Sequence, residues 1–117
     1  MTVLRFEDLK VWQKSQDLSD LIYKHFSKSR DFGFRDQITR ASVSISNNIA
    51  EGFERKTNPD FKRFLYYALA SNSEVRSMLY LLERLNYLEK EDSLKLIHDT
   101  NEISKMLYAF IKSMKSH

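Results

Sequence analysis

Residues 40–55 read RASVSISNNIAEGFER and form a helical pattern with apolar positions on more than one face. One stripe recurs at steps of three and four residues and consists of Ile38, Ala41, Ile45, Ile49 and Gly52. A second stripe, where a helix packed on one side only would carry Lys and Glu, consists of Val43, Asn47 and Ala50. Two such stripes need two packing partners. The stretch therefore predicts a helix inside a bundle, with a possible subunit contact on its second face.

The composition favours a single all-α domain. The chain has 117 residues, which suits one domain over residues 1–117. Two glycines and one proline are too few for the many turns of a sandwich or barrel. Because the chain has no cysteine, it contains no disulfide, no thiolate nucleophile and no sulfur-ligated metal.

The N-terminal sequence MTVLRFEDLK lacks the apolar core of a signal peptide, and no window approaches the roughly 20 apolar residues that span a bilayer. We therefore expect a soluble, cytoplasmic protein without membrane contact. The 19 Lys and Arg residues against 16 Asp and Glu residues give a net charge of +3. This mild excess is compatible with a polyanionic partner and does not require one.

Acidic and polar residues mark the ends of the first two predicted helices. Glu7 and Asp8 suit the positive end of a helix dipole, and the apolar pattern predicts a first helix from Glu7 to Lys28. The stretch SKSRDFGF is a short polar connection, which makes neighbouring helices antiparallel. The second helix is expected to end near Arg55.

The third predicted helix has the clearest start. Asn58 is a suitable N-cap and Pro59 suits the first helical position. No helix breaker follows until Leu85, and Asn86 can adopt the left-handed conformation that ends a helix. A fourth helix is expected to begin within EKEDS, residues 89–93. Four helices of about 20 to 25 residues predict an antiparallel up-down-up-down four-helix bundle.

No motif in the sequence indicates catalysis. Metal-binding bundles usually carry Glu-x-x-His pairs, and the sequence has none. It also lacks a nucleophile elbow, a glycine-rich phosphate loop and an HExxH motif. We expect a non-enzymatic protein without a metal or cofactor.

Small polar residues at positions expected to face inward form a first candidate set, for assembly rather than chemistry. They are Ser44, Asn47 and Asn48 on the second helix and Asn72, Ser73 and Glu74 on the third. A buried Asn in a helical interface often fixes register or oligomeric state, which favours assembly specificity over ligand binding. Glu51 is expected to pair with Arg40 or Arg76.

Basic residues concentrate around the turn between the second and third helices, and two aromatic rings follow. The set consists of Arg55, Lys56, Lys62, Arg63, Tyr66 and Tyr67. Cations for phosphates beside rings for bases suit a single-stranded nucleic-acid site. A solvated basic loop remains the alternative. If the four cations lie on one face with either tyrosine, nucleic-acid binding is favoured. If the cations are dispersed, a protein-binding scaffold is favoured.

Four segments carry a family resemblance: FEDLKVWQKSQDL, QITRASVSISNNIAEGFER, FKRFLYYALASNSEVRSMLYL and EISKMLYAFIKS. Together they resemble the four-helix bundle proteins encoded in intervening sequences of bacterial 23S ribosomal RNA genes. That family is similar in fold to the accessory variability determinant proteins of diversity-generating retroelements, pentameric barrels with a basic surface that work with a reverse transcriptase and nucleic acid. The resemblance implies a homopentamer whose partner is RNA or a nucleic-acid enzyme, and it supplies no catalytic residue.

The family signature falls on Ile45, Asn48, Ile49, Ala50, Glu51 and Gly52, and on Phe64, Ala68, Ser71, Ser73 and Glu74. By the resemblance, these positions shape the helix contacts. Many members have proline in place of Ser46 and glycine in place of Asn86. Without the proline, the second helix is expected to lack a kink.

Overall fold

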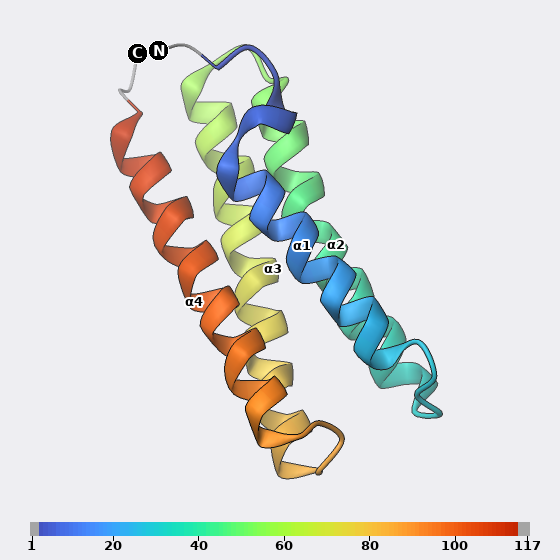
Figure 1. Ribbon diagram of the computed structural model, residues 1–117. Helices are drawn as coiled ribbons and strands as arrows, with labels where there is room; N and C mark the ends of the chain where they lie inside the picture. Colours follow the sequence, from blue (N-terminus) through green and yellow to red (C-terminus); the bar gives the residue numbers. More distant parts are fainter. Residues whose placement is uncertain (1–2, 115–117) are drawn as a thin grey trace.

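The computed structural model describes residues 3–114 and places four long helices side by side (Figure 1). After a 3₁₀ turn at Phe6–Asp8 come α1 (Lys10–Phe26), α2 (Phe32–Phe53), α3 (Asn58–Arg84) and α4 (Lys90–Ser113). Consecutive helices run in opposite directions, so the α1–α2 and α3–α4 turns lie at one end and the α2–α3 turn at the other (Figure 1). No strand occurs within residues 3–114. The predicted four-helix bundle is confirmed.

The first helix begins later and ends earlier than predicted, at Lys10 and Phe26 rather than Glu7 and Lys28. Glu7 belongs instead to the 3₁₀ turn, and Leu9 then takes an extended conformation with φ −73° and ψ 123°. This break turns the Leu9 side chain into the core, where it is 7% exposed. At this point the free energy gained by burying the Leu9 side chain is larger than that gained by continuing a helix along the surface.

The predicted N-cap of the third helix is wrong by one residue. Thr57 has the extended backbone of an N-cap, and its Oγ1 accepts a hydrogen bond from the Asp60 N–H at 3.3 Å. Asn58 is therefore the first helical residue and Pro59 the second. Proline is tolerated there because the first four N–H groups of a helix have no intrahelical partner.

The end of α3 follows the prediction for Asn86. Its φ is +59°, and among residues 3–114 it is the single non-glycine residue with positive φ. The Tyr87 N–H donates to the Leu82 carbonyl at 3.0 Å, and the Asn86 N–H donates to the Glu83 carbonyl at 3.1 Å. These two bonds form a Schellman motif, which satisfies carbonyls that the helix end leaves free.

The left-handed backbone at residue 86 predicts opposite effects for two substitutions. Asn86→Ala should lower the free energy of unfolding by about 1 kcal/mol, because a Cβ without a local polar partner disfavours this conformation. Asn86→Gly should match or exceed the parent protein, because glycine adopts it without a steric cost. Urea unfolding followed by circular dichroism measures both. Equal stability of the two variants would contradict this account of the turn.

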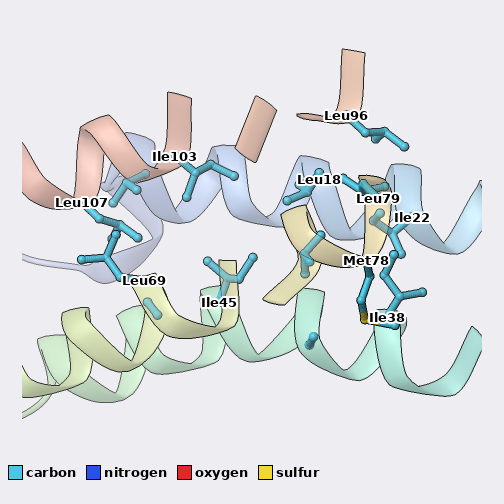
Figure 2. Close-up of a cluster of buried hydrophobic side chains, with 14 of the residues drawn as sticks. Leu18, Ile22, Ile38, Ile45, Leu69, Met78, Leu79, Leu96, Ile103 and Leu107 are labelled. Atoms are coloured by element: carbon cyan, nitrogen blue, oxygen red, sulfur yellow. The ribbon is translucent and has the colours of Figure 1, made fainter. Parts of the chain in front are cut away.

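Leucine and isoleucine side chains from all four helices meet along the bundle axis. Figure 2 shows members of this cluster, including Leu18, Ile22, Ile38, Ile45, Leu79, Leu96, Ile103 and Leu107. Ser46, which replaces the proline of many relatives, is fully buried within α2, and α2 continues unbroken through it. Its Oγ accepts a hydrogen bond from Gln16 Nε2 on α1 at 2.9 Å.

Helices α2 and α3 approach each other closely at Gly52, next to the turn that joins them. A Cβ built on Gly52 would lie 2.6 Å from Phe64 Cβ and 2.9 Å from Phe61 Cδ1. Phe61 also packs edge-to-face on Phe53 of α2 and on Phe110 of α4, with ring centroids 5.8 and 5.3 Å apart. A larger residue at position 52 would therefore push α3 and its aromatic cluster away.

Gly52→Ala should destabilise the protein by about 1 to 3 kcal/mol, the usual cost of overpacking, although alanine has the higher helix propensity. Gly33→Ala is the matched control, because a Cβ on Gly33 meets nothing within 4 Å. The control should leave the midpoint of urea unfolding unchanged or raise it slightly. If both variants unfold at the same urea concentration, the close approach at Gly52 does not limit stability.

Candidate nucleic-acid interface

The predicted basic residues surround the α2–α3 turn at one end of the bundle (Figure 1). Arg55 follows the end of α2, whereas Arg63 and Tyr67 lie one turn apart on α3. All three side chains are exposed, and Tyr67 retains 45% of its accessible surface. Exposure of both charge and ring is the first requirement for contact with a polyanion.

Two guanidinium groups lie against neighbouring aromatic rings at this end. Arg55 Cζ lies 4.9 Å from the centroid of Phe64, and Arg63 Cζ lies 5.3 Å from the same centroid. Arg63 also lies 5.9 Å from the ring of Tyr67, which packs edge-to-face on Phe64 at 5.5 Å. Cation–π attraction holds the two charges together on the aromatic surface. We call Arg55, Arg63, Phe64 and Tyr67 the arginine–aromatic cluster.

Arg63 is held by two further contacts. Its Nη1 donates a hydrogen bond to the Tyr67 hydroxyl at 3.5 Å, and its Nη2 forms an ion pair with Asp60 at 3.2 Å. The hydrogen bond and the charge interaction with Tyr67, followed by the interaction with Asp60, raise the pKa of Arg63. Arg63 therefore stays cationic at every physiological pH.

Carboxylates lie close to the arginine–aromatic cluster. Glu51 and Glu54 line the same shallow groove as Arg55 and Phe64, and Asp60 pairs with Arg63. These negative charges lower the local positive potential. A polyanion at this end would therefore depend more on direct contacts with the exposed guanidinium groups and rings than on long-range attraction.

The structure brings some of the residues predicted to bind nucleic acid into contact and places the others apart from them. Arg55, Arg63 and Tyr67 meet in the cluster, whereas Lys56 is exposed in the turn. Lys62 and Tyr66 share another row of α3, about 100° around the helix from Arg63 and Tyr67. Lys62 is half-buried, and Tyr66 is 53% exposed. The predicted set thus divides into a compact cluster and a neighbouring row.

The sequence pattern assigned one residue of this surface, Phe64, to the hydrophobic core. Its spacing from Phe61 and Ala68 places it on the apolar stripe of α3, so it reads as a core residue. In the structure Phe64 is half-buried, and the guanidinium groups of Arg55 and Arg63 both lie against its ring. The sequence signal that could have identified it is its position between Arg63 and Tyr67.

The predicted set of inward polar residues is buried only in part. Asn72 is fully buried on α3, and its Nδ2 donates to the Thr100 carbonyl and to Ser104 Oγ, both at 2.8 Å. Its Oδ1 has no partner within residues 3–114. Asn72 thus fixes α3 against α4, which agrees with a structural role.

Asn48 is half-buried and acts within its own helix, where its Nδ2 donates to the Ser44 carbonyl at 2.8 Å and to Ser44 Oγ at 3.0 Å. Ser71 of α3 donates to the same Ser44 Oγ at 3.0 Å. Glu74 is exposed and accepts a hydrogen bond from Gln37 Nε2 of α2 at 3.1 Å. These contacts link α2 to α3 at the rim of the bundle rather than in its core.

The expected inward position is wrong for Asn47, Ser73 and Glu74, all of which are exposed, and the expected pairing of Glu51 is wrong as well. Asn47 is exposed instead of inward, because it lies on the side of α2 opposite the buried Ile45 and Ile49. Glu51 is also exposed, and in the described part of the chain it forms no ion pair with Arg40 or Arg76. Arg76 instead donates to Asn101 Oδ1 of α4 at 3.0 Å.

Residues 3–114 contain no group of three or more His, Asp or Glu side chains arranged to hold a metal ion. None of the helices described combines the length and the apolar character that crossing a membrane requires.

The sequence matches the 23S rRNA-intervening sequence protein family over residues 7–109. The chain belongs to this family. A crystal structure of an S23 ribosomal protein family member of unknown function from Bacteroides thetaiotaomicron superposes with a TM-score of 0.82 at 32% sequence identity. The match covers 88% of this chain and 99% of that protein. No curated protein matches the chain. The family resemblance of the four sequence segments is thereby confirmed.

Proposed function

We propose that this family member is a non-enzymatic, oligomeric protein of the cytoplasm that binds single-stranded or structured RNA through the α2–α3 end of the bundle. The observation that carries the proposal is the arginine–aromatic cluster, in which two exposed guanidinium groups lie on adjoining rings. The family name, which refers to 23S rRNA, adds support for RNA as the polyanion.

A guanidinium group stacked on a ring has two remaining ways to contact RNA. Its N–H groups bind phosphate oxygens in the plane, and its outer face stacks on a base. Arg55 and Arg63 supply the N–H groups, and the exposed ring of Tyr67 supplies a second stacking surface. The aromatic contacts also orient both side chains before binding, which lowers the entropy lost on association.

Assembly would multiply this surface. A homopentamer, which the family resemblance implies, would present five copies of the cluster on one particle. Contacts that are weak for one chain then add through effective concentration. The apolar and small polar residues on the outer face of α2 support an oligomer, because they leave a helix face with few charges exposed.

A protein-binding scaffold is the second candidate, and the carboxylates favour it. Glu51, Glu54 and Asp60 surround the two arginines, which gives the surface both signs of charge. Mixed charges with exposed aromatic rings are common at protein interfaces. Under this alternative, the cluster contacts a protein partner and RNA is not retained.

RNA binding should depend on the four basic residues of the α2–α3 end. We expect the parent protein to retain a single-stranded oligouridylate of about 20 nucleotides on a filter at ~50 mM salt, and to lose it steeply as salt rises. Replacing Arg55, Lys56, Lys62 and Arg63 together by Ser should weaken binding at least about tenfold. Circular dichroism should show an unchanged fold, since surface charges contribute little to stability.

A matched control removes the same charge from the opposite end of the bundle. Lys24, Lys28, Arg30 and Lys90 are all exposed near the α1–α2 and α3–α4 turns, and their joint replacement by Ser should leave RNA affinity nearly unchanged. The variant Arg55→Lys with Arg63→Lys keeps the charge and should weaken binding by reducing stacking, without changing the salt slope. Absence of retention by the parent, or equal loss in the control, would leave the scaffold as the better proposal.

A further inference from the structure

A shallow groove of about 500 Å³ lies beside the arginine–aromatic cluster, where the 3₁₀ turn at Phe6–Asp8 meets the α2–α3 end of the bundle (Figure 1). Three parts of the chain contribute to it: the 3₁₀ turn, the end of α2 and the start of α3. Two aromatic rings, one small side chain and three charged groups line it, namely Phe6, Ala50, Glu51, Glu54, Arg55 and Phe64. We call this space the base groove.

The two aromatic rings of the base groove are held in place by their own contacts. The ring of Phe6 packs edge-to-face on Trp12 of α1, with ring centroids 5.3 Å apart, and the Leu9 N–H donates to the Phe6 carbonyl at 2.9 Å. Phe64 packs on the α2 backbone at Gly52. Walls that are already ordered lower the entropy lost when a flat, apolar ligand face packs on them.

Both carboxylates of the base groove are open to a ligand. Glu51 and Glu54 are three residues apart, so their side chains leave the same side of α2 at its end. Both residues are exposed, and within residues 3–114 neither forms an ion pair with a Lys, Arg or His. A carboxylate only accepts hydrogen bonds. The groove therefore offers acceptors between apolar walls.

Such a lining excludes phosphate and selects a base edge that donates. A phosphate in the base groove would face two carboxylates, and like charges repel. Among the four RNA bases, guanine alone has two adjacent donors on its Watson–Crick edge, the N1–H and N2–H groups. In adenine, cytosine and uracil each donor on this edge has acceptors as its neighbours. A carboxylate can accept two parallel N–H bonds, as it does from arginine, so guanine is the matching base.

We infer that the base groove binds a guanine of single-stranded RNA and makes the RNA site selective for this base. The inference rests on the proposed RNA-binding function and names the base that the site reads. The rings of Phe6 and Phe64 contact the base, and the carboxylates of Glu51 and Glu54 accept its N1–H and N2–H groups. The arginine–aromatic cluster binds the neighbouring phosphates.

This assignment gives the carboxylates a purpose beside the two arginines. Each negative charge weakens the attraction for the RNA backbone, which is the same for every sequence. A uracil in the base groove would bring its carbonyl oxygens against the carboxylates. The carboxylates thus disfavour the wrong base as well as favouring guanine, and selectivity needs both effects.

The longer groove along the side of α2 is a poorer match for a base. It measures about 620 Å³ and extends from Arg40 to Glu51, with Tyr23 of α1 as its single aromatic ring. Small and polar side chains, such as Ser44 and Asn47, make up its centre. A base in this groove has one ring to pack on instead of two.

The test uses heptauridylate and three derivatives with guanosine, inosine or 7-deazaguanosine at the central position. Each competes against a labelled oligouridylate of about 20 nucleotides at ~50 mM salt. With the parent protein, the guanosine heptamer should compete at least about fivefold better than heptauridylate. Inosine lacks the N2 amino group and should lose most of this preference. 7-Deazaguanosine keeps both donors and should match guanosine.

The double variant Glu51→Gln with Glu54→Gln should bring the guanosine and uridine heptamers within about twofold of each other, because each amide has one acceptor oxygen in place of two. The same variant should bind the labelled oligouridylate more tightly than the parent, since two negative charges are gone. The matched control is Glu89→Gln with Glu91→Gln, which removes two exposed carboxylates from the opposite end and should keep the preference. Circular dichroism should be equal for all three proteins.

Equal competition by guanosine and uridine heptamers, or by guanosine and inosine heptamers, would overturn the inference and leave RNA binding in place. A double variant that keeps the preference, or that loses oligouridylate binding altogether, would also overturn it. A parent protein that does not bind the labelled oligouridylate would contradict the proposed function itself, and the inference with it. The two failures are therefore distinguishable in one experiment.

Discussion

The close approach of α2 and α3 at Gly52 is the constraint on which the arrangement of side chains at the α2–α3 end of the bundle depends. Because position 52 has no side chain, Phe64 packs directly on the α2 backbone, and its ring reaches the surface beside Arg55. The same approach brings Phe61 between Phe53 and Phe110, which ties the turn to α4. The packing of a core glycine thus determines where two surface arginines meet.

Polar contacts link every pair of neighbouring helices around the bundle. Gln16 and Ser46 join α1 to α2, Ser71 and Ser44 join α2 to α3, and Asn72 and Ser104 join α3 to α4. The ring closes with Lys14 of α1 and Asp99 of α4, 3.7 Å apart. Leucine and isoleucine supply most of the burial but tolerate many registers. A buried polar atom needs a particular hydrogen-bond partner, and few of these registers supply it, so the polar contacts favour one register.

Residue patterns predicted the number, order and direction of the helices because apolar periodicity and turn residues act locally. Asn86 was predictable for the same reason. The starts of α1 and α3 were not, since Leu9 extends to reach the distant core and Thr57 competes with Asn58 as the cap. Arg55, Arg63 and Tyr67 were recognisable as candidates from their types. Phe64 was not, because its role requires two helices to meet at Gly52, a long-range contact that one sequence does not display.

The arginine–aromatic cluster and the groove along α2 lie in different parts of the molecule. The arginine–aromatic cluster lies at one end of the helix, whereas the groove with Arg40 and Glu51 lies along its side. A cyclic ring, as in the proposed function, would gather its clusters at one end and let one RNA molecule contact several of them.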